Sequence, residues 1–286
     1  MNNICNLCPN LCNVLRYNKK GACGEYENVR IAKYYLHPYE EPPISGTNGS
    51  GTIFFSGCSL KCVFCQNYDL SRSNRGKIIS TYELADVFKQ LEEKGAHNIN
   101  LVNPTHFSDK IIKALKIYKP NIPIVYNTHG YENLCVLKEI DEYVDIYLPD
   151  LKFFSPEVSL RYSKHSDYFE VAKNAISFMV NKPIKFSSNG LMQSGTIVRH
   201  LVLPNNVSDS KNILNWFKEY KDKAFLHIMS QYTPYGEIDS YPELKRKITK
   251  REYETVIDYA ISLNIEKLFY QDIKSASENF IPSWDY

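Results

Sequence analysis

The chain has 286 residues, and 43% of them are hydrophobic, which is the composition of a globular protein with a substantial core. Its 34 lysines and arginines nearly balance 32 aspartates and glutamates, and the net charge of +2 gives no electrostatic reason to expect a nucleic-acid or membrane partner. The first residues lack a basic leader and an apolar stretch, so we expect a cytoplasmic protein.

Residues 1–25 are rich in cysteine, and we predict that they form a small metal-binding segment. Residues 26–50 show little periodicity and contain several turn-forming residues, namely Pro38, Pro42, Pro43, Gly46 and Gly49. We predict that they form an extended linker packed on the body of the protein. Residues 51–286 would then form the main domain.

After residue 50 the sequence alternates between short apolar runs and amphipathic stretches. The predicted strands are Thr52–Phe55, Asn98–Val102, Ile122–Tyr126, Tyr143–Leu148, Thr196–Leu203, Ala224–Met229 and a last short strand over Lys267–Tyr270. The predicted helices are Thr81–Lys94, Ser108–Tyr118, Glu132–Ile140, Tyr168–Val180, Ser208–Glu219 and Thr249–Leu263. Such alternation gives a parallel sheet, and six clear units are too few for a closed barrel of eight. The sequence therefore predicts an α/β fold with a partial, open (β/α)6 barrel.

Seven of the eight cysteines lie in the first 65 residues, in two groups. The first group is Cys5, Cys8, Cys12 and Cys23, and the second is Cys58, Cys62 and Cys65. In a cytoplasmic chain such cysteines are more often metal ligands than disulfides. Four thiols can close a tetrahedral structural site, whereas three leave a coordination position open for chemistry. The remaining cysteine, Cys135, is expected to be a small buried residue of a helix.

Polar residues follow or end each of the six clear strands. They are Cys58; Asn103, Thr105 and His106; Asn127, Thr128 and His129; Asp150 and Lys152; Arg199 and His200; and Gln231 and Tyr232. Because the carboxyl ends of parallel strands meet at one edge of the sheet, we expect one continuous site. Two alternatives stay open: the histidines are hydrogen-bonded residues of the rim, and Asp150 and Lys152 are a simple surface ion pair.

The spacing Cys58-x3-Cys62-x2-Cys65 directly after a strand, with Phe64 before the third cysteine, resembles the radical S-adenosylmethionine (SAM) superfamily. The rest of the chain resembles uncharacterised homologues of pyruvate formate-lyase activating enzyme. The N-terminal cysteines also resemble theirs. The matching stretches are 97–106, 126–131, 145–152, 198–204 and 229–234.

The resemblance implies that Cys58, Cys62 and Cys65 hold a [4Fe-4S] cluster whose fourth iron takes the amino and carboxylate groups of SAM. An electron from this cluster would cleave SAM to methionine and a 5′-deoxyadenosyl radical. The residues that the resemblance places near SAM are Phe64, Asn103, Thr105, Asn127, Thr128, Asp150, Lys152, Arg199, Gln231 and Tyr232. Asn103-Pro-Thr105 stands where the family usually has Gly-Gly-Glu, so the backbone would bind the amino group of SAM here.

Asp150-x-Lys152 matches a motif that contacts SAM in activating enzymes, which favours a glycyl-radical protein as the substrate. Activating enzymes with extra clusters carry them between the first cysteine motif and Asp-x-Lys, whereas residues 66–149 contain only Cys135. The alternative is radical modification of a small molecule or peptide, and a third possibility is a non-catalytic metal-binding adaptor. The four N-terminal cysteines would hold zinc, iron or an auxiliary iron–sulfur cluster, and the partner would be a flavodoxin- or ferredoxin-type electron donor.

Overall fold

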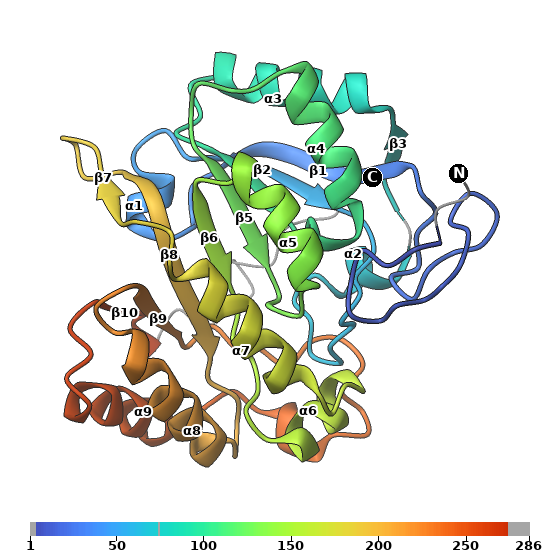
Figure 1. Ribbon diagram of the computed structural model, residues 1–286. Coiled ribbons are helices and arrows are strands. Elements are labelled where there is room, and N and C mark those ends of the chain that lie inside the picture. The colour runs from blue at the N-terminus through green and yellow to red at the C-terminus, as the bar shows by residue number, and fades with distance from the viewer. Residues whose placement is uncertain (1–3, 74, 274–286) are drawn as a thin grey trace.

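The computed structural model describes residues 4–73 and 75–273, which form an open sheet of ten strands covered by helices (Figure 1). The strands are β1 (Val29–His37), β2 (Ser50–Phe55), β3 (Lys77–Ile79), β4 (Ile99–Val102), β5 (Ile124–Thr128), β6 (Ile146–Pro149), β7 (Lys185–Phe186), β8 (Met192–Leu201), β9 (Phe225–Met229) and β10 (Leu268–Tyr270). Their order across the sheet is β10-β9-β8-β6-β5-β4-β2-β1-β3, with β7 paired to β8.

Seven strands of this path pair in parallel, namely β10, β9, β8, β6, β5, β4 and β2. At the other edge, β1 pairs antiparallel with β2 and with β3. The seven parallel strands correspond to the seven strands predicted from the sequence, including the short last strand β10. The sheet runs as an open path instead of closing on itself. The predicted partial, open barrel is therefore confirmed.

The helices are α1 (Pro42–Ser45), α2 (Tyr68–Ser73), α3 (Thr81–Glu93), α4 (Ser108–Ile117), α5 (Leu134–Ile140), α6 (Pro156–Ser163), α7 (Tyr168–Met179), α8 (Val207–Phe217) and α9 (Lys250–Ser262). Capping boxes start α3 at Ser80 and α9 at Thr249, as the sequence predicts for Thr249. Helices α3, α4, α5 and α7 lie along one face of the sheet in chain order (Figure 1). Among the described residues, no helix is both long and apolar enough to cross a membrane.

Residues 26–50 differ from the predicted linker, because they contain β1, which pairs antiparallel with β2 from His37↔Ser50 to Ile31↔Phe55. Val29 and Ile31 are buried in the main core. The turn-forming residues that suggested a linker all come after this strand, and Pro42 and Pro43 begin α1 instead of a loop. Within the predicted extended linker, residues 29–37 therefore form a strand of the sheet.

The face of the sheet away from the helices has two zones along each strand. Near the amino ends it is apolar, and α1 covers it in a small cluster of Ile44, Val125, Ile146, Leu148, Met192 and Ile197. Side chains alternate between the faces of a strand, so Asn127, Asp150 and Arg199 lie on this same face, two residues beyond Val125, Leu148 and Ile197. The carboxyl ends of the strands thus present polar groups above an apolar floor.

Candidate active site

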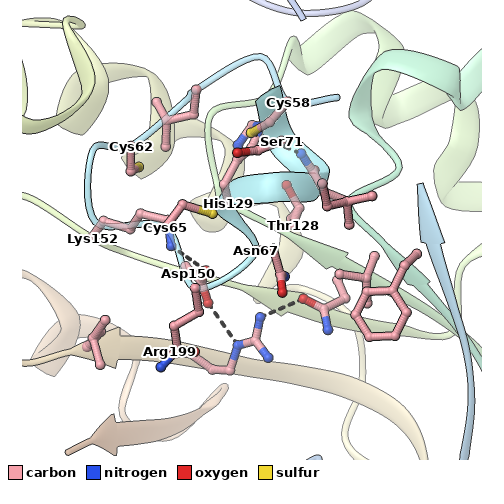
Figure 2. A pocket seen from close by; sticks show the side chains of 18 of the residues that line it. Cys58, Cys62, Cys65, Asn67, Ser71, Thr128, His129, Asp150, Lys152 and Arg199 are labelled. Atoms are coloured by element: carbon pink, nitrogen blue, oxygen red, sulfur yellow. Dashed lines mark hydrogen bonds and ion pairs between the residues drawn. The ribbon is translucent and has the colours of Figure 1, made fainter. Parts of the chain in front are cut away.

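A cavity of about 240 Å³ lies at the carboxyl ends of the parallel strands (Figure 2). It is lined by most of the residues that the sequence singled out: Cys58, Cys62, Phe64, Cys65, Asn103, Asn127, Thr128, Asp150, Lys152, Arg199 and Gln231. Figure 2 shows the cysteines on a loop that faces Asp150, Lys152 and Arg199 across the cavity. The structure thus brings the ends of six strands together around one space, and the roles of these residues stay predictions.

The loop that carries the three cysteines begins at Gly57, directly after β2. Gly57 has φ of +81°, and a Cβ there would lie 2.8 Å from the carbonyl oxygen of Cys23, so glycine is required. The Cys58 amide donates a hydrogen bond to that same carbonyl at 3.1 Å, and the Cys65 amide donates to the carbonyl of Cys62 at 3.3 Å. The backbone therefore fixes both ends of the loop.

Burial in the cavity wall disfavours the charged form of the thiols. It raises the pKa of Cys65 to about 11 and that of Cys62 further. The Lys152 ammonium opposes this rise at both cysteines. The Asn103 amide nitrogen lies 3.6 Å from the Cys58 sulfur, where it donates a weak hydrogen bond. A nearby cation and an amide donor both favour thiolates, which are the form that binds iron.

Asp150 lies between two cations on the opposite wall. Its carboxylate accepts hydrogen bonds from Lys152 Nζ at 2.6 Å and from Arg199 Nε at 2.9 Å. Burial alone would raise the pKa of Asp150, but Arg199 and Lys152 hold it below its ordinary value. Asp150 in turn raises the pKa of Lys152 against the effect of burial. All three groups are therefore charged at neutral pH. The ion pair of Asp150 and Lys152 lies in the cavity wall and is not a simple surface pair.

Glu40 also lines this cavity, although it is not among the site residues predicted from the sequence. Its carboxylate accepts from Asn100 Nδ2 at 2.8 Å, from Asn127 Nδ2 at 3.3 Å and from Arg199 Nη1 at 3.3 Å. Burial raises the pKa of Glu40 to about 7, and Arg199 opposes that rise. The adjacent Glu41 pairs instead with His227 at 2.7 Å, outside the cavity lining. The sequence feature that could have indicated Glu40 is the pair of adjacent glutamates in a proline-rich connection.

Of the three histidines at strand ends, only His129 lines the cavity. The Tyr131 amide donates to its Nδ1 at 3.1 Å, so Nε2 carries the proton and donates to Ser59 Oγ at 2.8 Å. Burial lowers the pKa of His129 to about 3, which keeps the ring neutral. His106 and His200 lie outside the cavity and hydrogen-bond to the carbonyls of Ser56 and Leu151. These two agree with the alternative of hydrogen-bonded rim residues.

Two predicted SAM contacts are not brought to the cavity. Thr105 is fully buried, and its hydroxyl lies 2.5 Å from Glu132 Oε1, which it reaches as a donor. The hydroxyl of Tyr232 donates to the carbonyl of Leu244 at 2.7 Å, while its ring packs against Phe64. Each hydroxyl is hydrogen-bonded to a buried group and neither residue lines the cavity, so these side chains support the residues that do line it.

The four N-terminal cysteines lie in one neighbourhood. Cys8 and Cys23 are buried, Cys5 and Cys12 are half-buried, and their thiols are close enough to influence one another electrostatically. Over residues 4–73 and 75–273, however, no three Cys, His, Asp or Glu side chains converge as ligands of one metal ion. Cys135 lies in α5 as predicted but is exposed, because it is in the first turn, away from the buried Val136 and Leu137. The prediction that it is buried is wrong.

Residues 52–196 match the model of the Radical SAM superfamily. The chain belongs to this superfamily. It is 31% identical over 278 residues to an uncharacterized protein of Methanocaldococcus jannaschii, an alignment that covers 93% of this chain and 76% of the relative. Membership of the radical SAM superfamily, predicted from the cysteine spacing, is therefore confirmed, and it implies a [4Fe-4S] cluster and SAM.

Two solved structures are similar to this chain at low sequence identity. SuiB of Streptococcus suis superposes with a TM-score of 0.52 at 13% identity, covering 78% of this chain and 47% of that protein. A domain of the pyruvate-formate lyase-activating enzyme of Bacteroides vulgatus has a TM-score of 0.40 at 10% identity, covering 67% and 91%. The likeness to SuiB extends to the fold alone.

The residues present fit the cofactors that the superfamily implies. Three thiols share one cavity wall with a cation and an amide donor beside them, and soft iron prefers thiolate ligands. Beyond them the cavity offers both signs of charge, and SAM carries an ammonium, a sulfonium and a carboxylate. Burial of each charged wall group with an opposite partner keeps these charges in place before SAM binds.

Proposed function

We propose that this chain is a radical SAM enzyme in which Cys58, Cys62 and Cys65 hold the [4Fe-4S] cluster. The observation that carries the proposal is that these thiols face the charged Asp150–Arg199 wall across one cavity. When bound, the cluster supplies one electron that divides SAM into methionine and a 5′-deoxyadenosyl radical, and this radical takes a hydrogen atom from the substrate.

The residues of the chain would bind and orient SAM. Asp150 matches the charge of the SAM ammonium, and Arg199 matches the carboxylate or hydrogen-bonds to the ribose. Asn127 and Thr128 would lie near the methionine part, and Gln231 near the adenine. Since Thr105 does not line the cavity and its hydroxyl donates to Glu132, the strand end 103–105 would contribute its backbone, as its departure from Gly-Gly-Glu suggests.

The neutral His129 and the buried aromatic ring of Phe64 complete the wall around the cysteines. His129 donates to Ser59 within the cysteine loop, so it links the end of β5 to the ligands. Phe64 packs edge-on against Phe153 and Tyr162, which holds the loop between Cys62 and Cys65 against the body. These contacts would orient the thiols and keep water from the radical.

For the substrate we propose the backbone glycine of a glycyl-radical protein, on the ground of the Asp150-x-Lys152 motif beside the thiols. A small molecule or peptide is the second candidate. It is favoured by the absence of further cysteines, other than Cys135, between the cysteine loop and Asp150. A flavodoxin- or ferredoxin-type protein would supply the electron in either case.

The test is anaerobic reconstitution with iron and sulfide, followed by incubation with SAM and dithionite. Wild-type protein should bind about four irons at the three-cysteine site and release methionine and 5′-deoxyadenosine. Cys58→Ala should abolish release, whereas Cys135→Ala should leave it unchanged because this cysteine is exposed and outside the cavity. Equal SAM cleavage by wild type and Cys58→Ala would refute the proposal.

The two substrate candidates separate in a second assay. The reconstituted protein is incubated with SAM and a glycyl-radical protein from the same genome, and electron paramagnetic resonance is recorded. A glycyl signal that requires intact Cys58 supports the first candidate. SAM cleavage without any such signal, together with a modified product from cellular peptides or metabolites, supports the second.

A further inference from the structure

The first part of the described chain, residues 4–27, has no hydrophobic core of its own. It contains no helix or strand, and its buried residues are Cys8, Arg16, Cys23 and Glu25. Ile4 and Leu11 are each more than half exposed, at 53% and 51%, and Leu7, Val14 and Leu15 are only partly buried. A segment of this length without regular structure or buried aliphatic groups needs another source of order.

Cys8 and Cys23 are buried within this segment, and Cys5 and Cys12 are half-buried. Around the first three, the Cys5 amide donates to the carbonyl of Val14 at 2.9 Å and the Leu11 amide donates to the carbonyl of Cys8 at 3.1 Å. Leu11 and Asn13 take the left-handed conformation, with φ of 41° and 52°, so the backbone turns back tightly between them. The chain is therefore coiled around its thiols instead of around apolar side chains.

The fourth cysteine is brought to the other three by a second turn. The Gly24 amide donates to the carbonyl of Gly21 at 2.9 Å, and the Ala22 amide donates to the sulfur of Cys12 at 3.1 Å. A Cβ on Gly21 would lie 3.4 Å from the sulfur of Cys23 and 3.7 Å from that of Cys12. The two sulfurs thus flank the same glycine, although they are eleven positions apart in the chain.

This segment also holds the catalytic loop. The carbonyl of Cys23 accepts the amide of Cys58 at 3.1 Å, and Asn10 Nδ2 donates to the carbonyl of Ser59 at 2.8 Å. Gly57 is packed so closely against Cys23 and Glu25 that a Cβ would overlap both. In Figure 1 the dark-blue N-terminal coil lies beside α2, at the end of the sheet where this loop lies. The position of the Cys58 thiol therefore depends on the order of the N-terminal segment.

We propose that Cys5, Cys8, Cys12 and Cys23 bind one soft divalent metal ion, of the class of Zn²⁺, as four thiolates, and that this ion fixes the loop from Gly57 to Ser59. The spacings of two and three residues within Cys5–Cys12 lie in the range of structural thiolate sites, and four ligands leave no open position. The four sulfurs of the metal-free chain do not converge on one point, so binding the ion would draw the thiols together. The metal supplies the order that apolar burial does not.

The inference goes beyond the proposed SAM chemistry and does not depend on it. The test therefore uses the full-length chain with Cys58, Cys62 and Cys65 replaced by alanine, so that only the four N-terminal thiols can bind. After chelation under anaerobic conditions it is titrated with Zn²⁺ or Co²⁺. We expect one equivalent per chain and, for Co²⁺, the visible bands of a tetrahedral thiolate complex.

Single replacements of the half-buried ligands, Cys5→Ser and Cys12→Ser, should weaken binding by more than about tenfold. They keep the fold testable if a fourfold variant does not fold. Cys135→Ser, which changes a cysteine outside the group, should bind like its parent. No metal binding by the parent, or unchanged binding in both single variants, would overturn the site. Incorporation of four irons with sulfide would overturn the single ion in favour of a cluster.

Hydrogen exchange tests whether the metal ion fixes the loop from Gly57 to Ser59, which is its bracing role. The Cys58 amide donates to the carbonyl of Cys23 and belongs to the backbone, so it can be followed even in the alanine variant. Metal should slow exchange in peptides that contain residues 56–60, and Cys12→Ser should lose this protection. Metal binding without a change in these peptides would overturn the brace. Failure of SAM cleavage in the wild type would affect neither readout.

Discussion

Glu132 is a buried carboxylate directly behind two strand ends of the cavity, and no cation of the described residues pairs with it. It is only 3% exposed, and its oxygens accept hydrogen bonds from the hydroxyls of Thr105, Thr128 and Tyr126. Burial raises the pKa of Glu132 to about 7, and the three hydroxyls oppose this rise without cancelling it. We predict that Glu132→Gln changes how the stability of the protein depends on pH.

The magnitude follows from the two pKa values. In the unfolded chain the carboxyl loses its proton near 4.5, and in the folded protein near 7. Between these values the folded state keeps a proton that the unfolded state has released, so the free energy of unfolding falls as the pH rises, by about 1.4 kcal/mol per pH unit. Across the whole window the wild type loses about 3 kcal/mol through Glu132, and above pH 7 the loss is complete.

Glutamine has nearly the same shape and does not titrate, so the variant should lack this part of the pH dependence. Urea unfolding followed by tryptophan fluorescence under anaerobic conditions, at pH 5 and at pH 8, measures it. The stability of the variant minus that of the wild type should increase by about 2.5 kcal/mol between the two pH values, because a small part of the loss has already occurred at pH 5. Other titrating groups are shared by both proteins and cancel in this difference.

Glu139→Gln in α5, the helix that follows Glu132 in the chain, provides the control, because Glu139 is exposed and its replacement should leave the pH dependence of the wild type. The reasoning would be refuted if Glu132→Gln and wild type lost stability in parallel from pH 5 to pH 8. That result would mean that the three hydroxyls hold the carboxylate as well as water does.

Two further predictions concern the cavity and its support. Glu40→Gln weakens a charge-assisted contact with Arg199 worth roughly 1.5–3 kcal/mol, so the KM for SAM should rise at least about tenfold. Glu41→Gln changes the adjacent residue, which lies outside the cavity lining, and should leave the KM unchanged. Equal KM values in both variants would contradict a cavity role for Glu40. Tyr232→Phe removes the hydrogen bond to the carbonyl of Leu244 and should lower the free energy of unfolding by about 1 kcal/mol in urea titrations, with an unchanged KM for SAM; a raised KM would place Tyr232 at the cofactor.

The sequence predicts the parallel sheet and the strand-end part of the cavity lining because both follow from local patterns. Apolar strands such as Ile53–Phe55 are short and end in polar residues, and parallel pairing then aligns those ends without further information. The cysteine trio is read from spacing alone. Each of these features depends on residues a few positions apart.

The contribution of residues 26–50 was missed because it depends on contacts far apart in the chain. Glu40 reaches Arg199, 159 positions away, and Asn127, 87 positions away. Nothing in the local sequence distinguishes it from Glu41, which turns to His227 instead. Which of two adjacent glutamates faces the cavity is decided by the path of the chain between β1 and α1, and no periodicity fixes that path.

Thr105 and Tyr232 were predicted to contact SAM because of their positions at strand ends, although their side chains do not line the cavity. Position at a strand end brings a residue to the cavity rim, but its hydrogen-bond partners decide how much of its side chain faces the cavity. Thr128, for example, also donates to Glu132 and still lines the cavity. Thr105 donates a hydrogen bond to Glu132, and Tyr232 donates one to the carbonyl of Leu244, whereas Arg199 donates to Asp150 between β8 and the end of β6, on the cavity side. A buried polar group must be hydrogen-bonded, so the partner determines the orientation. The strand ends therefore supply two layers of polar residues, one facing the cavity and one that holds it in shape from behind.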